Sequence, residues 1–299
     1  MAKNPADLIR SFYSKVERRP LRPPLLLSVP ITLNNIAGGL GDSVILTDFI
    51  YRTKGTWPCW SHSAAFQELR KFLPYPDTRS TPFHVNAAMA IDEYESGNGH
   101  FIQRIQRLFG LAVDPLPKGY LDVPTRKCKT IVMHFSPSAH AETQKRTIHP
   151  RARELYPETR AILEKYIAQS DHNFFVLGDV KIKGAENIHN PSVTQMVHLL
   201  ATASYFIGIM SGPLHIASAL SVPTIAIINF PAADRIYLPT LKPMGQVEEE
   251  WFYPQNVHLH QERSSNPLVP QITLNTLKKA IDGQIYPFWR KDWLPMIYE

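Results

Sequence analysis

The stretch Tyr205–Asn229, YFIGIMSGPLHIASALSVPTIAIIN, decides the fold. An apolar run ends at the turn Ser211-Gly212-Pro213, and a short helical pattern and a second apolar run follow it. Such short apolar runs bounded by Gly and Pro are typical of buried strands, so the stretch predicts strand, turn, helix and strand. A helix that starts directly after a strand points unpaired N–H groups and its positive dipole end at the turn. The turn is therefore a candidate phosphate-binding site.

The rest of the C-terminal half repeats this alternation. We expect strands at residues 130–134, 173–177, 205–209, 224–229 and 256–259, and helices at residues 151–170, 193–204, 213–220 and 274–281. Ser192 and Gln195 stand three residues apart before an apolar-periodic run, which matches a capping box. Regular alternation of strands and helices predicts a parallel sheet with helices on both faces.

The N-terminal half opens in a similar way. A strand is expected at residues 25–33, and the Gly-rich turn Gly38-Gly39-Leu40-Gly41-Asp42 leads from it into a helix. The apolar stripe of that helix is Val44, Ile45, Phe49 and Ile50. Further helices are expected at residues 64–72 and 100–109, with a short strand at 83–85 between them. A stretch rich in Pro and Gly, residues 115–124, is the best linker in the chain.

These patterns predict an α/β chain divided into four parts. Residues 1–23 form a basic arm, 24–125 a first Rossmann-like domain, 126–285 a second one, and 286–299 an aromatic tail that packs back on the first domain. The arm alternates basic and apolar residues, which suits a short helix on an anionic membrane face. A solvated arm packed on a neighbouring element is the alternative.

Composition limits the classes of protein. The chain has 299 residues, 44% of them hydrophobic, which is enough for two cored domains. A net charge of +6 suits an anionic partner such as a nucleotide, a lipid phosphate or nucleic acid without choosing among them. Cys59 and Cys128 form no CxxC pair, so neither a disulfide framework nor a zinc site is indicated, and a reducing cytoplasm fits best. We expect no membrane-spanning segment and no signal peptide.

The two Gly-containing turns follow strands, one in each domain, which is where open α/β sheets bind ligands. Asp42 presents a carboxylate at a helix start, where it serves as a cap worth about 1 kcal/mol, as a catalytic group, or as both. Because the glycines fall at positions 38, 39 and 41, the turn is not a GxGxxG dinucleotide fingerprint, and NAD is not expected.

In the second turn, Pro213 fits the first helical position and leaves the N–H groups of Gly212, Leu214 and His215 as donors. His215 is a candidate contact for phosphate or ribose, with a structural hydrogen bond as the alternative. We interpret His258 and His260 as surface or packing residues, since no third metal ligand stands nearby. An acidic loop with aromatic anchors, residues 248–253, either packs or touches a nucleobase.

Together, Gly38–Asp42 and the segment 210–224, MSGPLHIASALSVPT, resemble the ADP-heptose:lipopolysaccharide heptosyltransferases, glycosyltransferase family 9. The segment His134-Phe-Ser-Pro-Ser138 resembles a strand-end loop of that family, and Lys145-Arg146 its basic pair. The likeness covers roughly residues 34–52 and 130–230.

The resemblance implies the GT-B fold, with two Rossmann-like domains whose parallel sheets face an interdomain cleft. It implies a metal-independent inverting transferase without a cofactor, in lipopolysaccharide biosynthesis at the inner face of the cytoplasmic membrane. The donor would be a nucleotide-diphosphate sugar, bound by the C-terminal domain, and the acceptor a glycan or lipid-linked saccharide on the N-terminal side. Asp42 would be the general base. The leaving diphosphate would be stabilised by Lys145, Arg146 and the turn Ser211, Gly212, Pro213, Leu214 and His215.

One position departs from the family pattern. The residue before Ser-Gly-Pro is usually an Asp that contacts the donor sugar, and here it is Met210. A thioether is a weak hydrogen-bond acceptor, so the sugar need not be heptose, and loss of activity is conceivable. Two other classes therefore stay open. One is a nucleotide- or nucleic-acid-binding protein without transfer chemistry, and the other is a transferase that acts on nucleic acid or protein. No basic–aromatic array points to nucleic acid.

Overall fold

The structure is a computed structural model. It describes residues 32–34, 39–55, 59–60, 64–75, 84–86, 100–108, 111–136, 154–229, 253, 255–261 and 270–285. The expected basic arm and aromatic tail lie outside these residues.

The C-terminal half contains a six-stranded parallel sheet. Its strands, in spatial order, are β6 (Glu186–Ile188), β5 (Asn173–Leu177), β4 (Thr130–His134), β7 (Tyr205–Gly208), β8 (Thr224–Ile228) and β9 (Val257–His260). Numbered along the chain, this order is 3-2-1-4-5-6, the doubly wound arrangement whose strand order reverses between β4 and β7. The predicted parallel sheet is confirmed. The short polar strand β6 was not expected.

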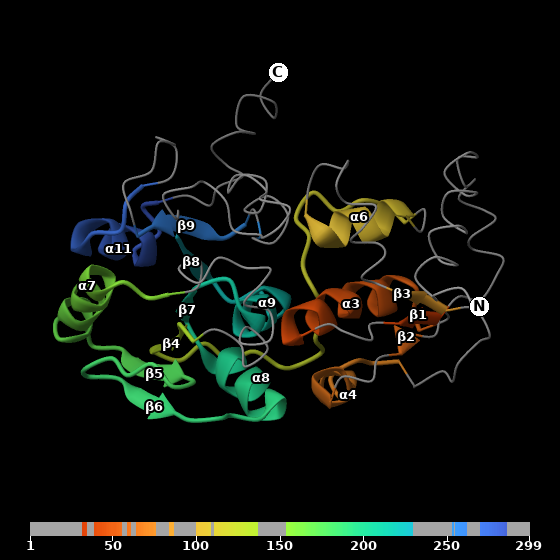
Figure 1. The fold of residues 1–299 in the computed structure, drawn as a ribbon, viewed down its shortest axis with the longest axis horizontal. Helices are drawn as coiled ribbons and strands as arrows, with labels where there is room; N and C mark the ends of the chain where they lie inside the picture. The colour runs from red at the N-terminus through yellow and green to blue at the C-terminus, as the bar shows by residue number, and fades with distance from the viewer. Residues whose placement is uncertain are drawn as a thin grey trace, which may run out of the picture.

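Helices cover both faces of this sheet (Figure 1). Alpha-helices α7 (Pro157–Ile167) and α11 (Leu274–Ile281) lie on one face, and α8 (Val193–Thr202) and α9 (Gly212–Ala219) on the other. Successive residues of a strand point to opposite faces. Accordingly, Ile131 and Met133 pack with the α7–α11 side, and Val132 packs with the α8–α9 side.

Local signals account for two helix starts. The predicted capping box is present before α8, since the Gln195 N–H donates to Ser192 Oγ at 3.1 Å and Gln195 Oε1 accepts the Ser192 N–H at 2.8 Å. Helix α7, in contrast, begins at Pro157, six residues after the expected start at 151. Tyr156 is in an extended conformation, and Pro is favoured at a helix start because its missing N–H costs nothing there.

The N-terminal half contains a smaller parallel sheet, in the order β2 (Cys59–Trp60), β1 (Thr32–Asn34) and β3 (His84–Asn86). Its helices are α3 (Leu40–Arg52), α4 (Ala64–Arg70) and α6 (Phe101–Leu108). The expected apolar stripe of α3 is confirmed, because Val44, Ile45, Phe49 and Ile50 are all buried.

The two halves share a continuous apolar core. One cluster of buried side chains runs from α3, α4 and α6 into α8 and α9, and α3 packs directly on α9 (Figure 1). The stretch expected to be a linker contains neither helix nor strand in residues 111–129 and is bonded to both halves. The Tyr120 N–H donates to Thr47 Oγ1 at 2.8 Å, and Lys118 Nζ donates to Ser221 Oγ at 2.9 Å. The linker therefore fastens the halves together.

In the described part of the chain, no helix combines the length and the apolar character that crossing a membrane requires.

Candidate functional site

The two Gly-containing turns lie against each other. A Cβ at Gly41 would be 2.6 Å from Cδ2 of His215, and a Cβ at Gly212 would be 2.7 Å from the side chain of Leu40. Neither position has room for a side chain. The start of α3 and the start of α9 are therefore in direct contact rather than separated by an open gap at this level.

Asp42 is the third residue of α3, and its carboxylate closes the helix start. Oδ2 accepts the N–H of Gly39 at 2.7 Å, and the side chain is half-buried. The N-cap is therefore Gly39 rather than the expected Asp42, and Asp42 stabilises the helix start from its third position by bonding back to the Gly39 N–H. The role of general base stays a prediction, and the position of Asp42 beside α9 is compatible with it.

The second turn offers fewer amides than expected. Helix α9 begins at Gly212, so Pro213 is its second residue rather than its first, and the Leu214 N–H donates to Ser211 O at 3.1 Å. Ser211 and Gly212 are half-buried, whereas Pro213, Leu214 and His215 are buried. The half-buried surface for an anion is therefore at Ser211 and Gly212.

Polar side chains gather where the strand order of the large sheet reverses. His134 ends β4, and its Nδ1 lies 2.9 Å from Oγ of Ser211. Ser136, two residues on, accepts the Asp179 N–H on its Oγ at 3.0 Å. Gly178 follows β5 with φ +89°, and a Cβ there would be 2.6 Å from Ser136 Oγ, so only Gly fits. Ligands of doubly wound sheets bind at this edge. His134 and Ser136 were part of the recognised strand-end loop but were not predicted as site residues.

Met210 is buried in the apolar core, with 3% of its surface exposed. Gly39 is half-buried beside Asp42. Gly38, Lys145 and Arg146 lie outside the described residues, so their expected places in the site stay predictions.

His215 belongs to a buried aromatic cluster. Its Nδ1 lies 2.8 Å from the hydroxyl of Tyr253, and the two rings meet edge to face at 5.4 Å between centroids. The other neighbour of Tyr253 is His100, whose ring centroid is 4.4 Å away. Burial raises the pKa of the Tyr253 phenol, with Asp48 adding to it, so the phenol keeps its proton at neutral pH. Sequence reasoning missed this cluster, although the aromatic anchor at residues 251–253 pointed to packing.

His258 and His260 are both buried on β9, which confirms packing rather than a surface position. Burial, and secondarily His258, lowers the pKa of His260 to about 3. Over the described residues, no three His, Cys, Asp or Glu side chains come together as a metal site.

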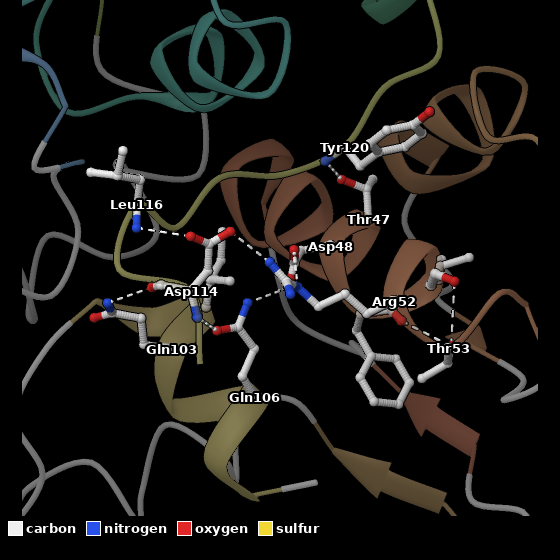
Figure 2. Close-up of polar contacts among 12 residues, drawn as sticks. Thr47, Asp48, Arg52, Thr53, Gln103, Gln106, Asp114, Leu116 and Tyr120 are labelled. Atoms are coloured by element: carbon white, nitrogen blue, oxygen red, sulfur yellow. Dashed lines mark hydrogen bonds and ion pairs between the residues drawn. The ribbon is translucent and has the colours of Figure 1, made fainter. Parts of the chain in front are cut away.

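A polar network joins α3 to α6 and to the linker (Figure 2). Arg52 donates to Asp48 Oδ1 and to Asp114 Oδ2, both at 2.7 Å, and Gln106 donates to Asp48 Oδ2 at 2.9 Å. Burial raises the pKa of Asp48, although the bonds from Gln106 and Arg52 oppose the shift. The network fixes α3, the helix that carries Asp42.

Two parallel sheets with this topology define a class, the GT-B fold, and solved structures share it. The Escherichia coli heptosyltransferase WaaC with ADP matches with TM-score 0.51 and 11% identity over 84% of this chain and 99% of that one. A family 9 glycosyltransferase from Veillonella parvula matches with TM-score 0.51 and 10% identity over 85% and 96%. The dodecameric glycosyltransferase TibC from enterotoxigenic E. coli matches with TM-score 0.52 and 15% identity over 79% of this chain. The chain spans 63% of the length of TibC.

The sequence narrows the class further. Residues 190–247 match the model of glycosyltransferase family 9 (heptosyltransferase). This segment includes α8, α9 and the turn between Met210 and His215. No curated protein matches the chain significantly. The resemblance expected from the sequence is confirmed, and the chain is heptosyltransferase-like in fold and in the segment that carries the second turn.

Proposed function

We propose that the chain is a metal-independent, inverting glycosyltransferase. It moves a sugar, either heptose or another hexose-like sugar, from a nucleotide-diphosphate donor to a hydroxyl of a glycan or lipid-linked saccharide. One observation supports this most directly, the contact of the two turns at Gly41–His215 and Leu40–Gly212. This contact places α3, which carries Asp42, beside the N-terminus of α9, where a phosphate can bind.

In this proposal Asp42 takes the proton from the acceptor hydroxyl as the oxygen attacks the anomeric carbon. The new bond joins that oxygen to the anomeric carbon, and the bond from this carbon to the diphosphate oxygen breaks. The departing diphosphate gains negative charge, which the amides at Ser211 and Gly212 and the side chains of Lys145 and Arg146 stabilise. Ser211 is held by His134, so its amide is positioned before the donor binds.

The donor base and sugar are proposed from the ligands of the similar structures and from the position of Met210. WaaC was solved with ADP, and TibC in complex with ADP-D-beta-D-heptose, which makes an ADP-sugar the first donor to try. Burial of Met210 argues against a polar contact with the sugar at that position. We therefore expect a sugar other than heptose to be accepted as well as, or better than, heptose. The family resemblance makes lipopolysaccharide the first acceptor to try, reached from the inner face of the cytoplasmic membrane.

Ligand binding is tested by thermal shift with ADP, UDP, GDP, CDP and their sugars. A ligand present at 100 times its Kd stabilises the folded chain by about 2.7 kcal/mol, which raises the melting temperature visibly. The Asp42→Asn variant should show the same shift, because Asp42 acts on the acceptor side. If no nucleotide raises the melting temperature of the wild-type chain, the proposal fails.

A second candidate is a nucleotide-binding protein without transfer chemistry. One observation favours it, the buried Met210 in place of an acidic residue. It predicts a thermal shift with a nucleotide and no release of nucleoside diphosphate from any nucleotide sugar. Turnover that depends on Asp42 would exclude it.

A further inference from the structure

A buried hydrogen-bonded pair of the C-terminal half, Tyr253 and His215, lies where that half meets the start of α3. Tyr253 has no exposed surface, and His215 is 3% exposed. His215 stands on α9, and its ring edge, Cδ2 and Nε2, fills the place where a side chain at Gly41 would begin. The pair therefore connects the segment before β9, the start of α9 and the first turn of α3.

The direction of the hydrogen bond between Tyr253 and His215 sets the tautomer of His215. Among the described residues, the phenol of Tyr253 has a single hydrogen-bond partner, Nδ1 of His215 at 2.8 Å. A buried hydroxyl that gives its proton to no acceptor loses its solvation without compensation. If Tyr253 is the donor to Nδ1, a neutral His215 carries its own proton on Nε2, the nitrogen that lies against Gly41.

We propose that Tyr253 is a positioning residue: by donating to Nδ1 it holds His215 as the Nε2–H tautomer with its ring edge against Gly41, and so fixes the turn that carries Asp42 relative to α9. The ring of His100 also packs on the Tyr253 ring, at 4.4 Å between centroids. This inference rests on the proposed function for its effect on transfer, but its structural part does not. Displacements of about 1 Å at a catalytic group lower rates by large factors, so the pair matters for kcat rather than for donor binding.

The first test needs no activity. In the full chain labelled with ¹⁵N-histidine, the His215 signals, assigned by their loss in His215→Gln, should show protonated Nε2 and unprotonated Nδ1. Tyr253→Phe keeps the ring and removes only the hydroxyl, and it should produce a mixture of the two tautomers. Protonated Nδ1 in the wild type, or unchanged signals in Tyr253→Phe, would overturn the proposal.

The second test separates positioning from general destabilisation. Tyr205→Phe is the matched control, because the Tyr205 hydroxyl likewise makes a hydrogen bond, to the main-chain oxygen of Ile281, but does so at the first residue of β7, away from the site. We expect Tyr253→Phe to lower kcat about tenfold with the donor KM within twofold, and Tyr205→Phe to change neither.

His215→Gln removes the partner atom, so adding Tyr253→Phe to it should cost little more. If Tyr253→Phe lowers kcat a further tenfold when it is added to His215→Gln, the proposal is overturned. A transferring wild type whose Tyr253→Phe variant keeps full kcat would overturn it as well. A wild type that neither binds nucleotide nor transfers contradicts the proposed function instead, and the ¹⁵N signals still decide the tautomer.

Discussion

At the scale of single residues, two glycines allow the turns to touch. We expect Gly41→Ala to destabilise the fold by about 1–3 kcal/mol, since the added methyl would overlap His215. Gly39→Ala is the control in the same turn, because a Cβ there meets only Asp42 Oδ2 at 3.8 Å and φ is −76°. Urea unfolding measures both. Equal losses in the two variants would contradict the contact.

His260 makes a prediction about pH. Its folded pKa, lowered to about 3, lies below the ordinary value of 6.5, so the unfolded chain binds the proton more readily. Above pH 6.5 His260 is neutral in both the folded and the unfolded chain, so it does not lower the free energy of unfolding. As the pH falls from 6.5 towards 3, only the unfolded chain takes up the proton, and the free energy of unfolding decreases. At pH 5 the loss is about 2 kcal/mol relative to pH 7. Urea unfolding of wild type and His260→Asn at both pH values should show a smaller fall in the variant, and equal falls would contradict the burial argument.

Sequence reasoning identified the residues whose signal is local. Asp42 was correctly placed at the start of its helix, although the N-cap is Gly39, and the helix after Ser211 follows from Gly212 and Pro213. The partnership of Tyr253 with His215 joins residues 38 positions apart, and no periodicity reports such a pair. The same holds for His134 and Ser211, which meet only because β4 and β7 are neighbours.

At the scale of elements, the Asp48–Arg52 pair holds α3 in place. Arg52→Met leaves Asp48 as a buried carboxylate, 5% exposed, and we expect a loss of about 3 kcal/mol. Adding Asp48→Asn removes that charge and should restore most of the loss.

The control is the surface pair of Lys129 and Asp171, both about 70% exposed, where Lys129→Met should leave the free energy of unfolding nearly unchanged. The comparison uses free energies of unfolding in urea. Additive losses in the Asp48–Arg52 double variant would contradict the coupling.

Element types were predictable because the strands and helices of the large sheet alternate with breakers between them. The strands β4 and β5 and the helix α11 match their expected ranges. The predicted start of α7 was wrong, because the helix begins at Pro157 and not at residue 151. The strands β2 and β6 have two and three residues, which is too short for an alternation of apolar and polar residues to be recognised in the sequence. Their pairing comes from neighbouring strands.

At the scale of the whole molecule, the shared core makes the halves one folding unit. Apolar side chains from α3, α4 and α6 pack in one cluster with those of α8 and α9, and the linker is bonded to both halves. We therefore expect a single unfolding transition, with calorimetric and van't Hoff enthalpies equal and the circular dichroism transition coincident. Two separated transitions would mean that the predicted domains, 24–125 and 126–285, unfold independently.

The central claim is that this chain transfers sugar with Asp42 as the base. The direct measurement is release of nucleoside diphosphate from a panel of nucleotide-diphosphate sugars, with truncated lipopolysaccharide as acceptor. We predict turnover by the wild type with at least one donor, and a loss of about 100-fold or more in Asp42→Asn. Asp171→Asn, at an exposed surface position, should retain full turnover. Turnover by Asp42→Asn equal to that of the wild type, or no turnover with any donor, would contradict the account.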